Sequence, residues 1–310
     1  MATGQSSASP WHVGICVADE PPHTSVLLDE VLEALQPAGS IAFSALDCTV
    51  GAAGHAFWLL ERSTPDGRLV GLDADPNALE LARRRLAPFG DRAHLLQRNF
   101  GELGELELEP VNAIVFDLGL SSMQLDSSGR GFSFRNDEPL DMRFDPSDAS
   151  RATAAELLNT LSEAELERVI REYGGEPRAR RVAREVVRWR PLQRTTELVA
   201  AVTAALGPGR RKISPATRTF QALRIAVNDE LGALEAGLDA AVRLLKTDGR
   251  VAVISFHSLE DRIVKWRMRG WADAGLVRVL TRKPIQATDA ETTRNPRARS
   301  AKLRVAERLP

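Results

Sequence analysis

Three acidic residues stand at the ends of short apolar segments in this 310-residue chain. Asp47, Asp73 and Asp117 end the runs 44–47, 68–73 and 111–117, which have the length and composition of buried strands. The carboxyl ends of parallel strands meet at one edge of a sheet, which is where α/β proteins bind ligands. Carboxylates gathered there could accept hydrogen bonds from ribose hydroxyls or attract a positive charge.

The loop after Asp47 favours one class of nucleotide. Residues 48–56 read CTVGAAGHA and lead into a helical segment, so the order is strand, tight turn and helix. Asp73 follows Gly51 by 22 residues, roughly the separation at which an acid reaches ribose hydroxyls. A pyrophosphate site has three glycines and no carboxylate facing the phosphate. The pattern therefore favours S-adenosyl-L-methionine, whose sulfonium and ammonium are cationic; glycines that serve only close packing are the alternative.

Composition and charge set wider bounds. Only two cysteines occur, so we expect neither a disulfide framework nor a metal site. There is no apolar run of membrane length, so we expect no membrane partner and a cytoplasmic location. The net charge of −1 hides an asymmetry: residues 171–224 hold thirteen Lys and Arg against four Glu, while residues 1–61 hold none. A basic face is therefore expected.

The elements that position the acids alternate as strand and helix. A helix is expected within residues 26–35, and Asp75 can cap another helix with Pro76 at its first position. Residues 93–97 make a third strand, followed at the carboxyl edge by Phe100. The Phe100 ring could cover an adenine there, or it could belong to the core.

The segment 118–149 shows no helical or strand pattern and is long for a loop inside a compact domain, which is typical of functional loops. It interleaves aromatic rings with arginines: Phe132, Phe134 and Phe144 with Arg130, Arg135 and Arg143. Such side chains could stack on a nucleic acid and neutralise its phosphates.

Residues 150–215 are expected to be helical and free of strands, and so to form an all-α insertion between the fourth and fifth strands. Two capping boxes are present, Thr153 with Glu156 and Ser162 with Glu165. A helix after Pro177 buries one apolar stripe and leaves outside Arg178, Arg180, Arg181, Arg184, Arg188 and Arg190. We expect these arginines to bind phosphates; a solvated face without a partner is the alternative.

The remaining residues return to the sheet. A helix over 231–245 and a strand over 250–255 are expected, with strands over 276–281 and 301–307 closing the sheet by an antiparallel edge. His257, Ser258 and Asp261 have the residue types of a hydrolytic triad, but they lie too close in sequence and no Gly-x-Ser-x-Gly turn exists.

Several motifs together resemble the RsmH family, also called MraW, in the order of that family. They are residues 117–126 (DLGLSSMQLD), 130–134 (RGFSF), 139–143 (PLDMR), 215–224 (PATRTFQALR), 255–265 (SFHSLEDRIVK) and 295–301 (NPRARSA). The resemblance runs from His23 to the C-terminus. It implies an α/β fold: a Rossmann-like class I methyltransferase sheet, mostly parallel with an antiparallel C-terminal edge, and an inserted all-α domain.

By this resemblance, residues 23–125 and 226–310 form the methyltransferase domain and residues 126–225 an inserted RNA-recognition domain, after a disordered extension over 1–22. The implied reaction transfers a methyl group from S-adenosyl-L-methionine to the exocyclic N4 of a cytidine in the decoding region of 16S rRNA. The substrate is expected within the small ribosomal subunit, and the protein is expected to be a monomer or homodimer.

The resemblance also implies site residues. Those for the cofactor are Ala53, Gly54, His55, Asp73, Phe100, Asp117 and Gln124, of which Asp73, Phe100 and Asp117 were also indicated by their strand ends. For chemistry, Asp117 would orient the cofactor or accept from the amine, and Ser121 or Ser122 would hydrogen-bond the base. For RNA, the expected residues are Arg130, Phe132, Phe134, Arg218 and His257, with Phe132 or Phe134 stacking on the extruded ring.

Two departures from the family pattern are visible. Ala52 and Ala53 stand where glycines are common, which would weaken cofactor binding if the backbone there needs a positive φ. The Pro-Pro-aromatic sequence of amino-methyltransferases is replaced after Asp117 by Leu118 to Ser122. Two other functions stay open: an amino-methyltransferase of DNA or free RNA, and a non-catalytic RNA-binding assembly factor.

Overall fold

The computed structural model describes residues 25–36, 42–63, 65–126, 128–207 and 214–310, without the side chains of Ser122 and Asp126. The extension predicted over residues 1–22 lies outside the described residues. Within them, no helix is both long enough and apolar enough to cross a membrane.

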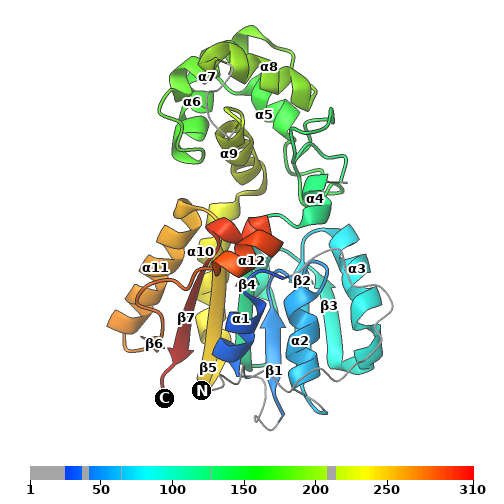
Figure 1. Cartoon of the computed structure of the whole chain (residues 1–310), viewed down its shortest axis with the longest axis vertical. Helices are drawn as coiled ribbons and strands as arrows, with labels where there is room; N and C mark the ends of the chain where they lie inside the picture. The colour runs from blue at the N-terminus through cyan, green and yellow to red at the C-terminus, as the bar shows by residue number, and fades with distance from the viewer. Residues whose placement is uncertain (1–24, 37–41, 64, 127, 208–213) are drawn as a thin grey trace, which may run out of the picture.

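Seven strands form one sheet in the order β3-β2-β1-β4-β5-β7-β6 (Figure 1). Strands β1 to β5 run parallel, whereas β7 is antiparallel to both β5 and β6. The mostly parallel sheet with an antiparallel C-terminal edge is therefore confirmed. The strands are β1 Ser44–Asp47, β2 Arg68–Asp73, β3 Ala93–Gln97, β4 Val111–Asp117, β5 Leu245–Ser255, β6 Val277–Val279 and β7 Lys302–Arg308.

Helices cover both faces of the sheet and bury two apolar clusters. One face is covered by α1 Leu28–Leu35, α2 Gly54–Arg62 and α3 Pro76–Leu86. The other is covered by α10 Glu230–Leu244 and α11 Ser258–Asp273. Asp75 caps α3 by accepting from the backbone N–H of Asn77, with Pro76 at the first position, as the sequence predicted.

A separate helical lobe stands over the carboxyl ends of the parallel strands (Figure 1). Its helices are α5 Ala154–Thr160, α6 Glu163–Glu172, α7 Ala179–Arg188, α8 Thr195–Leu206 and α9 Thr217–Asn228. The lobe buries its own apolar cluster, drawn from residues 132–227, and both predicted capping boxes are present. The chain enters the lobe after β4 and returns through α10 to β5. The all-α insertion predicted between the fourth and fifth strands is therefore confirmed.

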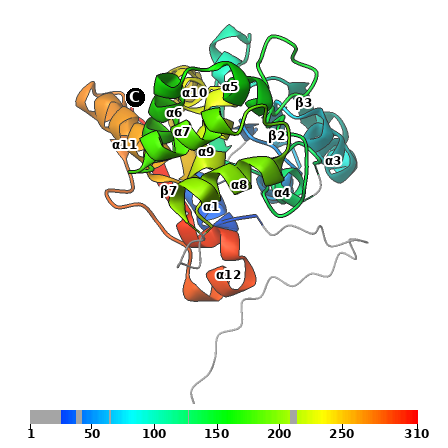
Figure 2. The ribbon, with the colours of Figure 1, turned by 90° about the horizontal axis from the view of Figure 1, so that it is seen from above.

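Two short helices were not predicted. Helix α4, Ser122–Asp126, lies in the segment expected to be a loop, and α12, Asp289–Arg294, precedes β7. A single turn of helix has no periodicity to detect. Helix α4 is held by contacts of Gln124 with Ser121 and with the distant Asp75, which the local sequence does not show. From above, α4 and α12 flank the region under the lobe (Figure 2).

Candidate cofactor and active site

The three strand-end acids come together because β2, β1 and β4 are neighbours in the sheet. The loop after β1 ties them to one another. The backbone N–H of Thr49 donates to Asp47 Oδ1 at 3.1 Å, and the Thr49 hydroxyl accepts from the backbone N–H of Asp117 at 2.6 Å. The backbone N–H of Gly51 donates to Asp73 Oδ2 at 2.9 Å. The sequence analysis did not identify Thr49. Its role depends on contact with Asp117, which lies 68 residues further along the chain.

The carboxyl groups of this cluster are poorly compensated. Burial raises the pKa of Asp47 to about 7, against the hydrogen bond from Thr49 and with a smaller contribution from Asp73. Burial, and after it repulsion from Asp47 and Glu260, raises the pKa of Asp117 to about 8. Burial also raises the pKa of Asp73 to about 6, against hydrogen bonds from Asp75 and Gly51. Asp117 Oδ1 is buried without a hydrogen-bond partner among the described residues. A cluster of buried acids in which Asp117 Oδ1 has no partner fits a cation-bearing ligand, the kind of ligand that the sequence predicted.

These raised pKa values predict that the ligand-free protein loses stability with rising pH. A carboxyl group whose folded pKa exceeds its unfolded value stabilises the fold when protonated. That contribution is complete below about pH 4 and is lost as pH rises through about 6, 7 and 8 for Asp73, Asp47 and Asp117. Thermal unfolding followed by circular dichroism should show the melting temperature falling between pH 5 and 9. Asp117→Asn should reduce the fall between pH 7 and 9; an equal fall in both proteins would contradict the assignment.

His55 lies beside Asp117 in a neutral state. Its ring is buried, Nε2 lies 3.1 Å from the carbonyl oxygen of Val26, and Nδ1 lies 3.6 Å from Asp117 Oδ2. Burial lowers the pKa of His55 to about 4. With Nε2–H donating to Val26, Nδ1 keeps its lone pair. His55 therefore supplies no positive charge to Asp117 and leaves that carboxyl group available to a ligand.

Of the two alanines that replace the usual glycines in the loop, one has a strained backbone conformation. Ala53 has φ of 60° and precedes α2, whereas Ala52 is not among the residues of positive φ. At the next residue, a Cβ on Gly54 would lie 1.9 Å from Ser25 Oγ, so any other residue there would require the Ser25 side chain to move. Strain is therefore confined to Ala53, whose methyl group is fully buried in the core.

We expect Ala53→Gly to change the free energy of unfolding by less than about 1 kcal/mol. Relief of left-handed strain, about 1 kcal/mol, is offset by loss of a buried methyl, about 0.8 kcal/mol. Ala53→Val should be clearly destabilising instead, since a β-branched residue rarely adopts this conformation. Urea unfolding measures both variants, and a large stabilisation by glycine would show that the methyl contributes little packing.

A cavity of about 380 Å³ opens between the sheet and the lobe beside Asp73 and Phe100. It is lined by Ala74, Gln97, Arg98, Asn99, Glu102, Phe144, Asp145, Asp148, Arg151 and Asn228. The half-buried Phe100 ring packs edge-on against Phe116, with centroids 5.7 Å apart, and adjoins the core under α10. Both interpretations of Phe100 thus keep support, since it is part of the core and adjoins the cavity.

Gln124 and Arg130 meet at Asp75, which is completely buried. Gln124 Nε2 donates to Asp75 Oδ2 at 3.1 Å, and Arg130 Nη2 forms a short ion pair with the same oxygen. Arg130 also donates to the carbonyl oxygens of Arg143 and Phe144. The expectation that Arg130 contacts RNA is thus not supported, because its guanidinium is buried and holds the 130–144 segment to the end of β2. The sequence indicated Asp75 only as a helix cap.

Phe132 and Phe134 also differ from expectation. Phe132 is 5 % exposed and stacks on Phe144 with centroids 5.8 Å apart, while Phe134 packs edge-on against Phe220. Phe132 is buried in the lobe's core and Phe134 is half-buried against it, so both rings contribute to the packing of the lobe. Ser121 lies at the carboxyl edge, where its backbone N–H and Oγ bind Gln124; the Ser122 side chain lies outside the description.

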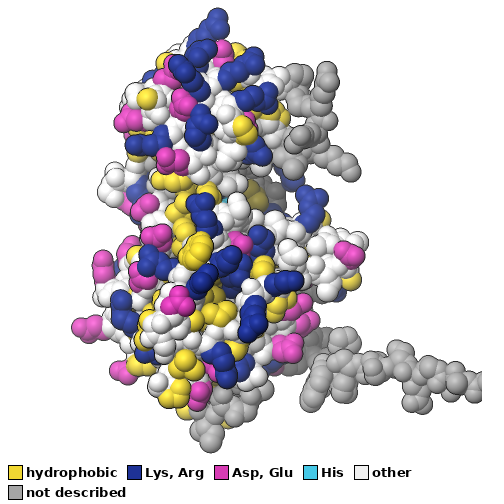
Figure 3. Space-filling model, turned by 90° about the vertical axis from the view of Figure 1, so that its left-hand side faces the viewer, with side chains coloured by type: hydrophobic (Ala, Val, Ile, Leu, Met, Phe, Trp, Pro, Cys, Tyr) yellow, Lys and Arg dark blue, Asp and Glu magenta, His cyan; other side chains and the backbone are white. Residues whose placement is uncertain are grey.

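Arg218 and His257 lie in different parts of the molecule, Arg218 in the lobe near the start of α9 and His257 in the sheet domain directly before α11. Arg218 is exposed on α9, with Nη1 3.4 Å from Glu176. His257 caps α11: Nδ1 accepts from the backbone N–H of Glu260, and Nε2 lies 3.0 Å from Glu260 Oε1. The predicted arginine-rich helix α7 buries Ala179, Val182, Ala183 and Val186 and exposes its arginines. Lys and Arg side chains cover much of one face of the lobe (Figure 3).

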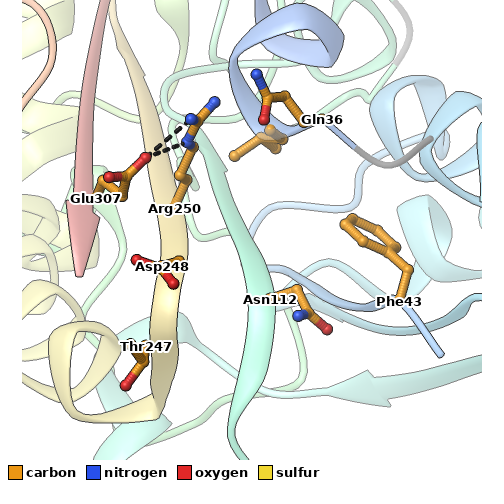
Figure 4. Close-up of a pocket in the computed structure, with 8 residues that line it drawn as sticks. Gln36, Phe43, Asn112, Thr247, Asp248, Arg250 and Glu307 are labelled. Carbon is orange, nitrogen blue, oxygen red and sulfur yellow. Dashed lines mark hydrogen bonds and ion pairs between the residues drawn. The ribbon is translucent and has the colours of Figure 1, made fainter. Parts of the chain in front are cut away.

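A second cavity, of about 300 Å³, lies at the opposite edge of the sheet (Figure 4). Arg250 there donates to Glu307 at 2.8 Å and to the carbonyl oxygen of Ala34 at 2.7 Å. Asn112 near the start of β4 also lines it. This cavity is separated from the strand-end acids by the length of β4 and is not part of the site.

Comparison with known proteins decides the family. A profile described as "MraW methylase family" matches residues 20–309. The chain belongs to the MraW methylase family. Among its relatives are proteins named "Ribosomal RNA small subunit methyltransferase H". The one from Geobacter sulfurreducens is 49% identical over 93% of this chain and 99% of its own length, and the one from Symbiobacterium thermophilum is 48% identical over 93% and 96%.

Membership confirms the methyltransferase resemblance recognised in the sequence. S-adenosyl-L-methionine is the cofactor of this MraW-family methylase, and the acidic strand ends suit its cationic groups. The positions expected to bind it, from Ala53 to His55, Asp73, Phe100, Asp117 and Gln124, lie at the carboxyl edge of the sheet or directly beside it. Their individual roles remain predictions.

Proposed function

We propose that this MraW-family methyltransferase transfers a methyl group from S-adenosyl-L-methionine to the exocyclic N4 of a cytidine in the decoding region of 16S rRNA. The proposed substrate is the small ribosomal subunit, which places the reaction in the cytoplasm. The names of the relatives support small-subunit rRNA as the substrate. The observation that carries the chemistry is the buried, unpartnered Oδ1 of Asp117 at the strand ends.

The adenosine and methionine ends of the cofactor would bind at different parts of the carboxyl edge of the sheet. Asp73 would accept from the ribose hydroxyls, and the cavity beside Ala74 and Asn99 has the size for the adenosine end. The loop over Ala53, Gly54 and His55 would contact the methionine end near Asp117. When bound, S-adenosyl-L-methionine supplies an electrophilic methyl group on a cationic sulfur.

Asp117 is the proposed acceptor for the amine proton. The N4 amine of cytosine is a poor nucleophile because its lone pair is delocalised into the ring, so alignment and a proton acceptor are both needed. The high pKa of Asp117 makes its carboxylate a stronger base than an exposed one. Ser121 or Ser122, directly after this strand end, would hydrogen-bond the base.

RNA recognition is assigned to the lobe. The exposed arginines of α7 and Arg218 would bind phosphates sequence-independently, because a charge contact to the backbone carries no base information. His257, fixed by Glu260 at the start of α11, would border the substrate from the side of the sheet. Because Phe132 is buried, base stacking would fall to the half-buried Phe134, to another group or to a rearranged lobe.

The experiment that tests this function supplies labelled S-adenosyl-L-methionine with small ribosomal subunits, protein-free 16S rRNA or duplex DNA. Subunits should be labelled, and mapping of the modified base should find N4-methylcytidine in the decoding region. Labelling of DNA, or of another rRNA position, would contradict the proposal. Absence of cofactor binding by calorimetry at millimolar concentration would favour the non-catalytic assembly factor.

A further inference from the structure

Helix α11 carries a basic and aromatic stripe that the fold does not use. The stripe consists of Arg262, Lys265, Trp266 and Arg269, whose spacing places them on one face of the helix. The helix packs on the sheet through other residues, Val264, Met268 and Trp271. Trp266 is 55% exposed, the highest value among the large hydrophobic side chains of the described residues. Core packing therefore does not explain this tryptophan.

The cations of the stripe surround the Trp266 ring. Lys265 Nζ lies 5.7 Å and Arg269 Cζ 5.5 Å from the ring centroid, within the range of cation–π contacts. Arg269 has only a distant acid, Asp273 at 3.9 Å, and both side chains are mostly exposed. Neither Arg262 nor Lys265 has an ion-pair partner within the part of the chain that the structure describes. By contrast, Arg267, on another face of α11, is neutralised by Glu235 and Asp239.

The stripe and the basic helices of the lobe lie on the same side of the molecule. In both ribbon views α11 and the lobe helices α6 and α7 lie toward the same side (Figures 1 and 2). The space-filling view of that side shows Lys and Arg side chains over both the lobe and the sheet domain (Figure 3). Trp189, at the end of α7, is also exposed, at 43%. This side therefore carries cations over both the lobe and the sheet domain (Figure 3).

We propose that the face formed by Arg262, Lys265, Trp266 and Arg269 is a second RNA-binding surface, which contacts the RNA of the small ribosomal subunit outside the target nucleotide. The cations neutralise phosphates, and the tryptophan stacks on an unpaired base or a ribose. A negatively charged, ring-bearing polymer is the partner that matches both components. This inference rests on the proposed rRNA substrate. Because α11 begins at Ser258, directly after His257 and the end of β5, RNA held along it reaches the carboxyl edge of the sheet.

Two variants test the surface without touching the cofactor site: Trp266→Ala and Arg262→Glu/Lys265→Glu. Their controls are Trp58→Ala on α2, where the tryptophan is 38% exposed, and Arg68→Glu/Arg83→Glu, two exposed arginines elsewhere. The charge variant should raise the KM for small subunits about tenfold and lower the salt dependence of subunit binding by about two phosphate contacts. Trp266→Ala should raise the KM several-fold. The kcat, the cofactor Kd and the melting temperature should stay within twofold or a few degrees of wild type, as for the controls.

An unchanged KM in both α11 variants, or an equal rise in the controls, would overturn this surface while leaving the methyltransferase activity intact. A change in oligomeric state on Trp266→Ala, measured by sedimentation, would show a contact between copies and overturn it as well. If the wild type does not methylate subunits, the proposed function fails. In that case, co-sedimentation still compares how strongly the wild type and the α11 variants bind small subunits.

Discussion

Replacing Asp117 by alanine should lower the rate of methyl transfer by roughly 10²- to 10⁴-fold, the usual contribution of a positioned proton acceptor. The carboxyl group has a pKa raised to about 8 and a buried oxygen without a partner among the described residues. It is therefore available to bind a ligand and contributes no stabilising interaction through that oxygen. Single-turnover labelling of subunits at saturating cofactor would measure the loss in the chemical step itself.

The protein should stay folded, because the folded state no longer holds a buried carboxyl group of raised pKa, which costs free energy at neutral pH relative to the unfolded chain. The melting temperature of Asp117→Ala at pH 8 should thus be no lower than that of wild type. Asp117→Asn is the matched variant: it keeps the shape and a carbonyl oxygen but is a far weaker base. Near wild-type turnover in both variants would show that Asp117 has no role in the mechanism. Near wild-type turnover in Asp117→Asn alone would show that Asp117 orients the cofactor or the base and does not accept the proton.

Replacing Arg130 by alanine should destabilise the protein by about 3–5 kcal/mol, because it leaves Asp75 as a buried, unpaired charge. Asp75 is completely buried and Arg130 nearly so, and the guanidinium also donates to the carbonyl oxygens of Arg143 and Phe144. Cofactor affinity should fall as well. The backbone N–H of Asp75 donates to Asp73 Oδ1 at 2.8 Å, so the pair holds the proposed ribose acceptor in place.

The matched control is Arg267→Ala, since Arg267 pairs with Glu235 and Asp239 at the surface. Exposed pairs contribute about 0–1 kcal/mol, so this variant should unfold near the wild-type urea concentration. Asp75→Asn/Arg130→Met should recover part of the stability without restoring full cofactor affinity. A loss for Arg130→Ala as small as that for Arg267→Ala would show that the ion pair with Asp75 contributes little to stability.

The sequence allowed the strand ends to be predicted because each acid follows a run of apolar residues. Asp47, Asp73 and Asp117 therefore lie as expected, and so do the helices whose caps are local, such as α5 and α6. The basic face of α7 was also predictable, since its apolar stripe repeats at the helical period. These features depend on residues within one or two turns of each other.

The interior of the 118–149 segment was predicted less well, since its contacts are made across the chain. Arg130 lies 55 residues from Asp75, and nothing local distinguishes an arginine that binds RNA from one that pairs with a buried acid. The same holds for Phe132 and Phe134. An aromatic ring next to arginines in the sequence can equally well stack on a base or pack in an apolar core.

The lobe has its own apolar core and joins the sheet through two chain crossings, after β4 and before α10. A graft that exchanges residues between these crossings would therefore leave every strand pairing intact. Such a chimera needs to keep the segment from Gln124 to Arg130, whose side chains reach Asp75. The architecture thus offers a route to retarget methylation, in which the lobe that we propose binds the RNA is replaced and the sheet domain with the proposed cofactor site is kept.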